Sequence, residues 1–270
     1  MNKKIGFIGF VKMAQAMAGG MIKSGLVNPE NIIASMRTEK TRIFVKKQFG
    51  IETSSSNRKV AETADTLFLA VAPHTYSEVI EEVREAVKRD VIIITIAAGI
   101  TTKDVEQAFR KKVKVVRTMP NTPSLVGAGM TAVSANSQVM DEELKDVEAL
   151  LGSFGKVEVI SESLMDAIPA ISGSSPAYVY MLIEALADGG VRQGLSRGQS
   201  YRLAAQAVLG AAQMVLETGK HPGELKDQVT SPGGATIAAV STLEQERFRG
   251  AVLAAMDSCT EKVKELGKKK

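Results

Sequence analysis

Short apolar runs alternate with amphipathic segments from residue 4 to about residue 160. Several of these runs, such as the one at 91–96, are apolar at nearly every position. Strands of that kind are buried on both faces, as in a parallel sheet that helices cover on either side. The runs lie at residues 4–8, 31–35, 66–71, 91–96, 114–118, 130–134 and 156–160. The alternation predicts an α/β fold with a Rossmann-like, doubly wound sheet over residues 1–162.

The pattern changes after about residue 163, beyond which only helical segments are predicted. Ser175 and Pro176 suit the cap and first turn of one helix, and Ser196 with Gln199 forms a capping box for the next. The predicted helices run from 175 to 194, from 196 to 219, from His221 and Pro222 onward, from 234 to 245 and from 250 to 266. We therefore predict an all-helical second domain over residues 163–270.

The helix predicted at 202–217 is apolar or small around most of its circumference, whereas a surface helix has one apolar stripe and one polar face. Such a helix has to be buried on several sides. Because the predicted helical domain is small, part of this cover is expected to come from a second subunit. We predict a homodimer built on the helical domain, and burial within the same chain is the alternative.

Composition and charge narrow the class of protein. The 270 residues are 44% hydrophobic, which allows one large or two modest cores, and the formal net charge is only +4. No basic stripe carries interleaved aromatic residues, so no nucleic acid is expected as a partner. No apolar window approaches the roughly 20 residues of a membrane span, so no membrane is expected either. A cytoplasmic location is the default expectation.

Cysteine and histidine offer little chemistry in this chain. The one cysteine, Cys259, excludes an internal disulfide, and it lies on a helical stripe with Val252 and Val263, which favours packing over a nucleophilic role. His74 is predicted in a solvated loop and His221 at the start of a helix, so neither is assigned an acid-base role. Without a cluster of ligands, no metal site is predicted.

The turn after the first predicted strand resembles a dinucleotide-binding turn with one altered position. Gly9 and Ala14 occupy the first and third glycine positions of the fingerprint, and Phe10, Val11 and Lys12 fill the loop between them. The second glycine normally lets the pyrophosphate approach the backbone. Val11 is therefore expected to weaken cofactor binding or to shift the cofactor.

The end of the second predicted strand favours NADP over NAD. NAD sites usually end this strand with an acidic residue on the ribose hydroxyls, but here Ser35, Arg37 and Thr38 precede the first carboxylate, Glu39. Hydroxyls and a guanidinium suit a 2′-phosphate, because arginine donates paired, charge-assisted hydrogen bonds. The alternative is that Arg37 belongs to the solvated first turn of a helix.

Three later motifs are more specific than the glycine turn. They are VVRTMPNTPSLVGAGMTAV at 115–133, ISGSSPAYVYMLIEALADGGV at 171–191 and HPGELKDQVTSPGGATIAAVSTLE at 221–244. In this order and spacing the chain resembles the pyrroline-5-carboxylate reductase family over essentially its whole length. The resemblance implies NAD(P)H-dependent reduction of the cyclic imine 1-pyrroline-5-carboxylate to L-proline, in proline biosynthesis. It also implies a helical domain that interlocks with a second subunit, and in many members larger rings of dimers.

The resemblance also implies a set of site residues. The cofactor residues would be Gly9, Phe10, Val11, Lys12 and Met13 at the pyrophosphate; Ser35, Arg37 and Asn57 around the adenosine ribose and its phosphate; Val71, Ala72, Pro73, Ala97, Ala98 and Gly99 beside the cofactor; and Met119, Pro120 and Asn121 at the nicotinamide. The substrate residues would be Ser231, Gly233, Gly234, Ala235 and Thr236, contributed by the partner subunit. NADPH is the predicted cofactor, with NADH as the alternative.

The chain departs from the family pattern around the predicted cofactor site. The family usually has Ala-Gly-Asn or a close variant at residues 10–12, and usually lysine at Ala72, and Met36 replaces a residue that is commonly polar. The substrate motif is intact. The alternative to an active reductase is therefore a catalytically silent or repurposed homologue, a binding or scaffold protein that has kept the fold.

The substrate motif SPGGAT suits a small anion that resembles an amino acid. Its glycines leave backbone N–H groups accessible, and the helix that follows adds a favourable dipole. Thr236 is the candidate catalytic residue, with its hydroxyl directed at the ring nitrogen, and an ordinary helix cap is the alternative. A 3-hydroxyacid dehydrogenase shares this two-domain plan but typically relies on a lysine in the helix opening the second domain, and none lies between Gly173 and Gly190.

Overall fold

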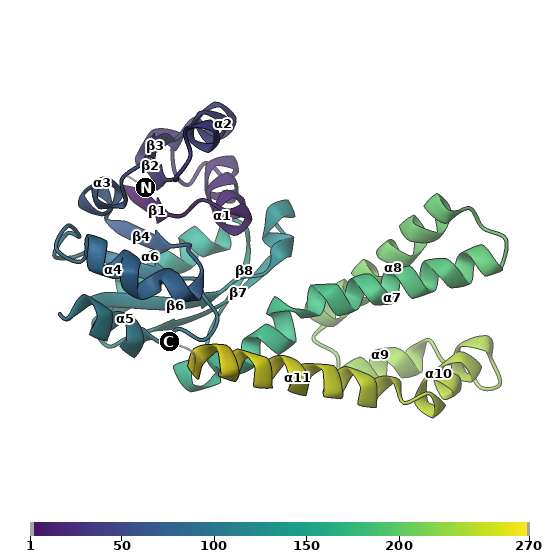
Figure 1. Cartoon of the computed structure of the whole chain (residues 1–270). Helices are drawn as coiled ribbons and strands as arrows, with labels where there is room; N and C mark the ends of the chain where they lie inside the picture. The colour runs from purple at the N-terminus through teal and green to yellow at the C-terminus, as the bar shows by residue number, and fades with distance from the viewer. Residues whose placement is uncertain (1–2, 269–270) are drawn as a thin grey trace. The chain divides into compact units, whose positions relative to one another are not determined.

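The computed structural model describes residues 3–268 and divides the chain into two compact units (Figure 1). Unit 1 comprises the chain up to Ser174 together with the segment from Cys259 onward, and unit 2 comprises Ser175–Ser258. Unit 1 contains the β-sheet and unit 2 is helical. The fold class predicted from the sequence, a Rossmann-like sheet followed by a helical domain, is confirmed.

The sheet of unit 1 has eight strands in the order β3-β2-β1-β4-β5-β6-β7-β8. The strands are β1 (Ile5–Ile8), β2 (Ile32–Ser35), β3 (Glu52–Ser54), β4 (Thr66–Leu69), β5 (Ile92–Thr95), β6 (Lys114–Met119), β7 (Gly129–Ala135) and β8 (Gly155–Val159). The pairs from β3 to β6 are parallel, and β7 runs antiparallel to β6. The chain builds outward from β1 in one direction and then from β4 in the other, which makes a topological switch point between β1 and β4.

Helices cover both faces of this sheet, as the continuous apolar runs predict. One layer contains α1 (Lys12–Lys23), α2 (Glu39–Phe49) and α6 (Asp141–Gly152), and the other contains α3 (Asn57–Thr63), α4 (Tyr76–Val83) and α5 (Thr102–Phe109). In β5, Ile92 and Ile94 enter the first core whereas Ile93 enters the second. Alternate side chains of one strand therefore fill two cores, so no polar face remains.

The strand β3 was not predicted from the sequence. It has three residues, and Glu52 at its start is exposed. It pairs in parallel with β2 at the edge of the sheet, where Ile33 aligns with Glu52. Backbone hydrogen bonds to β2 define this strand, and they need no apolar side-chain pattern.

Unit 2 is built from α7 (Ser175–Arg192), α8 (Arg197–Thr218), α9 (Pro222–Gln228), α10 (Ala235–Gln245) and the first part of α11 (Phe248–Lys268). The predicted capping box at Ser196 and Gln199 is confirmed, and α8 ends at Gly219 in the left-handed conformation. His221 caps α9 by accepting a hydrogen bond from the Gly223 N–H at 3.0 Å. These helix ends are local signals, so sequence alone predicts them.

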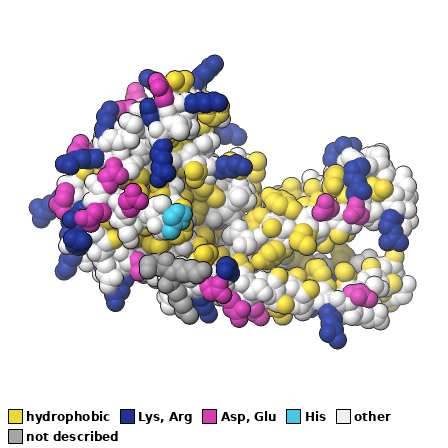
Figure 2. All heavy atoms as spheres, viewed as in Figure 1, with side chains coloured by type: hydrophobic (Ala, Val, Ile, Leu, Met, Phe, Trp, Pro, Cys, Tyr) yellow, Lys and Arg dark blue, Asp and Glu magenta, His cyan; other side chains and the backbone are white. Residues whose placement is uncertain are grey.

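The helices α7 and α8 pack as an antiparallel pair through small side chains. Ala187, Ser200 and Ala204 are buried there, and a Cβ on Gly190 would lie 2.7 Å from the Ser200 Oγ. Larger apolar side chains of unit 2 stay exposed within the single chain. Figure 2 shows hydrophobic side chains gathered on the helical unit. The exposed large apolar residues of α7 and α8 include Met181, Leu203, Leu209, Met214 and Leu216. Exposed large apolar side chains that gather in this way are expected to have a protein partner.

The short helices before unit 2 pack on the sheet of unit 1. They are η4 (Glu162–Ala167) and the π-helix η5 (Pro169–Gly173). Asp166 and Glu162 lie 2.5 Å and 3.8 Å from the guanidinium of Arg117, which is buried on β6. This packing extends unit 1 to Ser174, and α11 returns to unit 1 at Cys259. The predicted domain boundary between residues 162 and 163 stays a prediction.

An ion pair on unit 1 should make stability depend on pH. Glu143 and Lys114 lie 2.6 Å apart and are both largely buried. Burial would raise the pKa of Glu143, but the hydrogen bond from Lys114 and the N–H of Met140 lower it on balance below 4.5. A lowered pKa in the folded state stabilises the fold above pH 4.5, and this stabilisation is lost as the pH falls through the folded pKa.

We expect Glu143→Gln to lower the free energy of unfolding by about 1 kcal/mol at pH 7, with the deficit shrinking below pH 4.5. Glutamine still accepts the Met140 N–H bond, so only the charge is lost. Urea unfolding at several pH values measures the effect. Glu142→Gln, in the same first turn but without Lys114, is the matched control. A deficit that does not change with pH would contradict the prediction.

Candidate active site

The turn after β1 requires glycine because of its backbone conformation and its neighbours. Gly9 has a φ of +80°, in the left-handed region. A Cβ at this position would lie 2.6 Å from the carbonyl oxygen of Ala70 and 2.9 Å from the Val71 Cγ1. Gly9 therefore packs against the segment that leaves β4, which places it at the switch point of the sheet. In doubly wound folds, ligands bind at this edge.

The three residues after Gly9 have different environments. Phe10 is buried, with its ring edge-on to Phe7 and Phe49 at centroid distances of 5.5 Å and 5.6 Å. Val11 is 62% exposed and occupies the N-cap of α1 without a side-chain hydrogen bond, and Lys12 is exposed in the first turn. That turn contains no acidic residue. Its free N–H groups and its dipole therefore suit phosphate oxygens.

A polar cluster joins the end of β2, the start of α3 and the last turn of α4. Ser35, buried at the end of β2, donates a hydrogen bond from its hydroxyl to the Asn57 Oδ1 at 2.7 Å, and the Asn57 amide donates to Glu82 at 2.7 Å. Arg37 is exposed two residues after Ser35. The structure thus brings Ser35 and Asn57 together, as the resemblance implies. Glu82 was not predicted, because no motif marks an exposed glutamate on a helix.

The remaining predicted cofactor residues follow β4, β5 and β6. They are Val71, Ala72 and Pro73; Ala97, Ala98 and Gly99; and Pro120 and Asn121, with Met119 ending β6. Because these strands are parallel, all of these residues share one edge of the sheet with Gly9 and Ser35. Ala72 is exposed, and Gly99 has a φ of +74°.

Both polar atoms of the Asn121 side chain are hydrogen-bonded within unit 1. Its Nδ2 donates to the Ser172 carbonyl at 2.9 Å, and its Oδ1 accepts the Met130 N–H at 2.9 Å. It thereby ties the end of β6 to β7 and to η5. Any contact that Asn121 makes with a cofactor would come from its backbone, unless these bonds break.

A buried network of hydroxyl groups, which was not predicted from the sequence, lies below the edge of the sheet that carries the predicted cofactor residues. The hydroxyl of Tyr76 donates to the Leu69 carbonyl at 2.6 Å and lies 2.8 Å from the Thr95 hydroxyl. Thr118 donates from its hydroxyl to the Thr95 carbonyl at 2.9 Å. Burial raises the pKa of Tyr76 far above its ordinary value, so the phenol stays neutral. The network joins the ends of β4, β5 and β6 below the predicted cofactor residues.

Unit 2 contains the predicted substrate motif in a tight turn. The Gly234 N–H donates to the Ser231 carbonyl at 3.0 Å, with Pro232 and Gly233 between them. Gly233 has a φ of +69°, as the third residue of a type II turn requires. Gly234 then begins α10 as its N-cap without a side-chain hydrogen bond, and Thr236 is exposed in the first turn. The first N–H groups of α10 therefore stay available to an anion.

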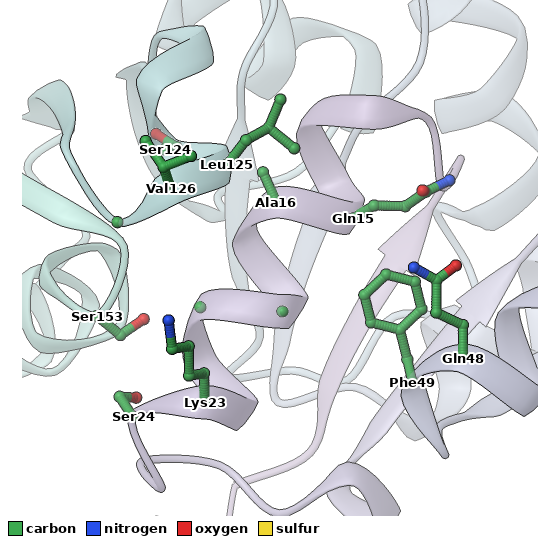
Figure 3. A pocket seen from close by; sticks show the side chains of 13 residues that line it. Gln15, Ala16, Lys23, Ser24, Gln48, Phe49, Ser124, Leu125, Val126 and Ser153 are labelled. Atoms are coloured by element: carbon green, nitrogen blue, oxygen red, sulfur yellow. The ribbon is translucent and has the colours of Figure 1, made fainter. Parts of the chain in front are cut away.

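A separate cavity of about 570 Å³ lies along α1 of unit 1. Figure 3 shows Lys23, Ser24 and Ser153 at one end and Gln48 and Phe49 at the other. None of the predicted cofactor residues lines it.

Among the described residues 3–268, no group of three or more acidic, histidine or cysteine side chains is placed to hold a metal ion. No helix in this part of the chain is long and apolar enough to cross a membrane.

Comparison with known proteins identifies the family. Residues 162–266 match the family described as pyrroline-5-carboxylate reductase dimerisation, and residues 4–99 match the family described as NADP oxidoreductase coenzyme F420-dependent. The pyrroline-5-carboxylate reductase of Escherichia coli (strain K12) is 47% identical over 268 residues, which cover 99% of this chain and 100% of that protein. The chain belongs to the pyrroline-5-carboxylate reductase family.

Other members of the pyrroline-5-carboxylate reductase family match equally completely. The enzyme of Arabidopsis thaliana is 39% identical over 97% of this chain and 95% of its own length. The crystal structure of Plasmodium falciparum pyrroline carboxylate reductase with NADP bound superposes with a TM-score of 0.89, at 33% identity and 98% coverage of both chains. The structure from Coxiella burnetii gives a TM-score of 0.91 at 36% identity, with 98% of this chain and 99% of that chain covered.

The comparisons confirm the predicted family, reaction class and cofactor class. Pyrroline-5-carboxylate reductases are NAD(P)H-dependent oxidoreductases that act on a C=N bond. The alternative of a catalytically silent homologue finds no support, because the full-length relatives carry the name of the reductase. The match to a dimerisation family supports oligomerisation through the helical part of the chain. The roles of individual site residues stay predictions.

Proposed function

We propose that this chain reduces 1-pyrroline-5-carboxylate to L-proline with NADPH, or with NADH as the alternative reductant. The observation that carries the proposal is the 47% identity to a pyrroline-5-carboxylate reductase over 99% of the chain. The reduction adds a hydride to the imine carbon and leaves a proton on the nitrogen, so the C=N bond becomes a C–N bond. NAD(P)H, when bound, supplies that hydride, and the protein supplies position and charge.

The cofactor end of the proposed site lies on unit 1. The free N–H groups of the first turn of α1, with Lys12, would hold the pyrophosphate. The missing Cβ at Gly9 lets the turn lie against Ala70, and the residues after β4, β5 and β6 would border the cofactor up to its nicotinamide. Ser35, Arg37 and Asn57 would border the adenosine ribose, and Arg37 would supply the positive charge for a 2′-phosphate. The donors present fit an anionic dinucleotide, because the first turn of α1 holds no carboxylate.

The substrate end of the proposed site lies on unit 2. The uncapped N–H groups at the start of α10 would bind the substrate carboxylate, and the Ser231 hydroxyl would add a donor. Thr236 would direct its hydroxyl at the imine nitrogen and hold the proton there while the hydride arrives. The Gly233 turn supports this role because it presents Ser231 and the start of α10 on one short loop.

We propose that the working form is a homodimer, in which the partner subunit contributes the substrate loop. Exposed apolar side chains on α7 and α8, such as Met181 and Leu216 at 70% and 81% exposure, support a subunit interface there. Light scattering should then give a mass of at least twice the 28.8 kDa of one chain. A mass of one chain at working concentration would contradict the proposal. Larger rings and a cytoplasmic location stay predictions.

The test of the proposed function is the loss of absorbance of the reduced nicotinamide in the presence of 1-pyrroline-5-carboxylate. NADPH and NADH are compared at saturating substrate, in protein shown to be folded and oligomeric. Proline formation with either cofactor supports the reductase. A folded oligomer that binds cofactor but forms no proline would overturn the proposal and would favour a repurposed homologue.

A further inference from the structure

We propose that Glu82 sets the choice between NADPH and NADH by holding the amide of Asn57. This inference rests on the proposed function, because it concerns the ribose end of the proposed cofactor site. Glu82 is a specificity-determining residue in this view, and it takes no part in hydride transfer.

The orientation of the Asn57 amide follows from its two neighbours. Glu82 accepts a hydrogen bond from Asn57 at 2.7 Å, and an ionised carboxylate can only accept, so the atom facing it is the Nδ2. The Oδ1 then faces Ser35, whose hydroxyl donates to it at 2.7 Å. The single proton of Ser35 is used in this bond, because the alternative acceptor, the Phe7 carbonyl, lies at 3.5 Å.

The hydrogen bonds from Ser35 to Asn57 and from Asn57 to Glu82 disfavour the binding of a 2′-phosphate. A phosphate has only acceptor oxygens at the ribose, so it needs donors, and the proton of Ser35 is already committed. The second amide hydrogen of Asn57 is available, but its use would place two anions on one nitrogen, about 5 Å apart. At that separation like charges repel appreciably even near water. Arg37, exposed two residues after Ser35, is the group proposed to offset this repulsion.

A ribose 2′-hydroxyl fits the same groups without repulsion. The hydroxyl can accept the free hydrogen of Asn57, and because it carries no charge the Glu82 carboxylate does not repel it. In many NAD sites an acidic residue at the end of the second strand accepts from the ribose. Here β2 ends in Ser35, and the carboxylate arrives from α4 instead. Glu82 thus disfavours the 2′-phosphate of NADPH and leaves the ribose hydroxyl of NADH unopposed.

The test compares the affinity of the full-length protein for NADPH and for NADH by fluorescence titration. Glu82→Gln keeps the acceptor for Asn57 and removes the charge. We expect NADPH to bind about 5-fold more tightly and NADH to bind no more tightly, with a smaller effect in 0.5 M salt. The exposed position of Glu82 lets the variant fold, and unchanged thermal unfolding verifies that.

Glu81→Gln is the matched control, because it removes the same charge from the same helix. Glu81 pairs with Arg84 at 2.6 Å and is not bonded to Asn57. An unchanged NADPH to NADH ratio in Glu82→Gln, or an equal shift in Glu81→Gln, would overturn the inference while cofactor binding by the parent protein leaves the proposed function intact. If the parent protein binds neither cofactor, the proposed function itself fails.

Discussion

Replacing Gly9 with alanine should abolish measurable NADPH binding and lower the free energy of unfolding by about 2–4 kcal/mol. Two costs add at this position. A φ of +80° is unfavourable for alanine by about 1–2 kcal/mol. The new Cβ would also lie 2.6 Å from the Ala70 carbonyl oxygen, so β1 and the segment after β4 would have to separate. That separation opens the edge on which the cofactor is proposed to lie.

Gly25→Ala separates the two costs. Gly25 has a φ of +73°, and a Cβ at this position would meet no atom within 4 Å. We expect this variant to lose only about 1–2 kcal/mol and to bind NADPH as the parent protein does. Urea unfolding and fluorescence titration give the two readouts. Equal losses in the two variants, or normal NADPH binding by Gly9→Ala, would show that the close approach to Ala70 is unimportant.

Removing the hydroxyl of Thr236 should lower kcat by about 100-fold or more, with cofactor affinity unchanged. Thr236→Val keeps the shape of the side chain. The hydroxyl lies exposed in the uncapped first turn of α10, where it is proposed to hold the proton at the imine nitrogen. Steady-state kinetics should show the loss in kcat to exceed any rise in KM for the substrate. Thr236→Ser, which retains a hydroxyl, should recover most of the activity.

The control for this variant lies in the same helix. The Thr242 hydroxyl donates to the Ala238 carbonyl at 3.2 Å, so it serves the helix and is not in the proposed site. Thr242→Val makes the same chemical change and should leave kcat unchanged. A Thr236→Val enzyme that keeps its kcat within twofold would remove Thr236 from the mechanism and would leave it as an ordinary residue of the first turn.

Local signals made much of the fold predictable. Strands such as β5 are apolar at nearly every position, and burial in two cores explains that pattern. The capping box of α8 spans only Ser196 to Gln199 and acts within one turn. By contrast, the short edge strand β3 was missed, since its backbone bonds to β2 leave no apolar pattern. The predictable elements are those that local contacts and burial define.

The candidate site was predictable in position but not in its supporting contacts. The glycine turn and the SPGGAT motif lie on short continuous segments, so spacing and family resemblance locate them. The hydroxyl network of Tyr76 joins residues on four elements, and Thr95 lies 19 residues further along the chain. Nothing in the sequence around Tyr76 distinguishes it from an ordinary core aromatic residue.

The sequence by itself determined the class of fold, the helix ends and the family, because burial patterns, caps and continuous motifs act over a few residues. Only the tertiary structure decided which groups meet at the edge of the sheet. Asn57 contacts Ser35, 22 residues away, and Glu82, 25 residues away. These contacts follow from the strand order β3-β2-β1-β4, which brings distant segments together and leaves no periodic trace in the sequence.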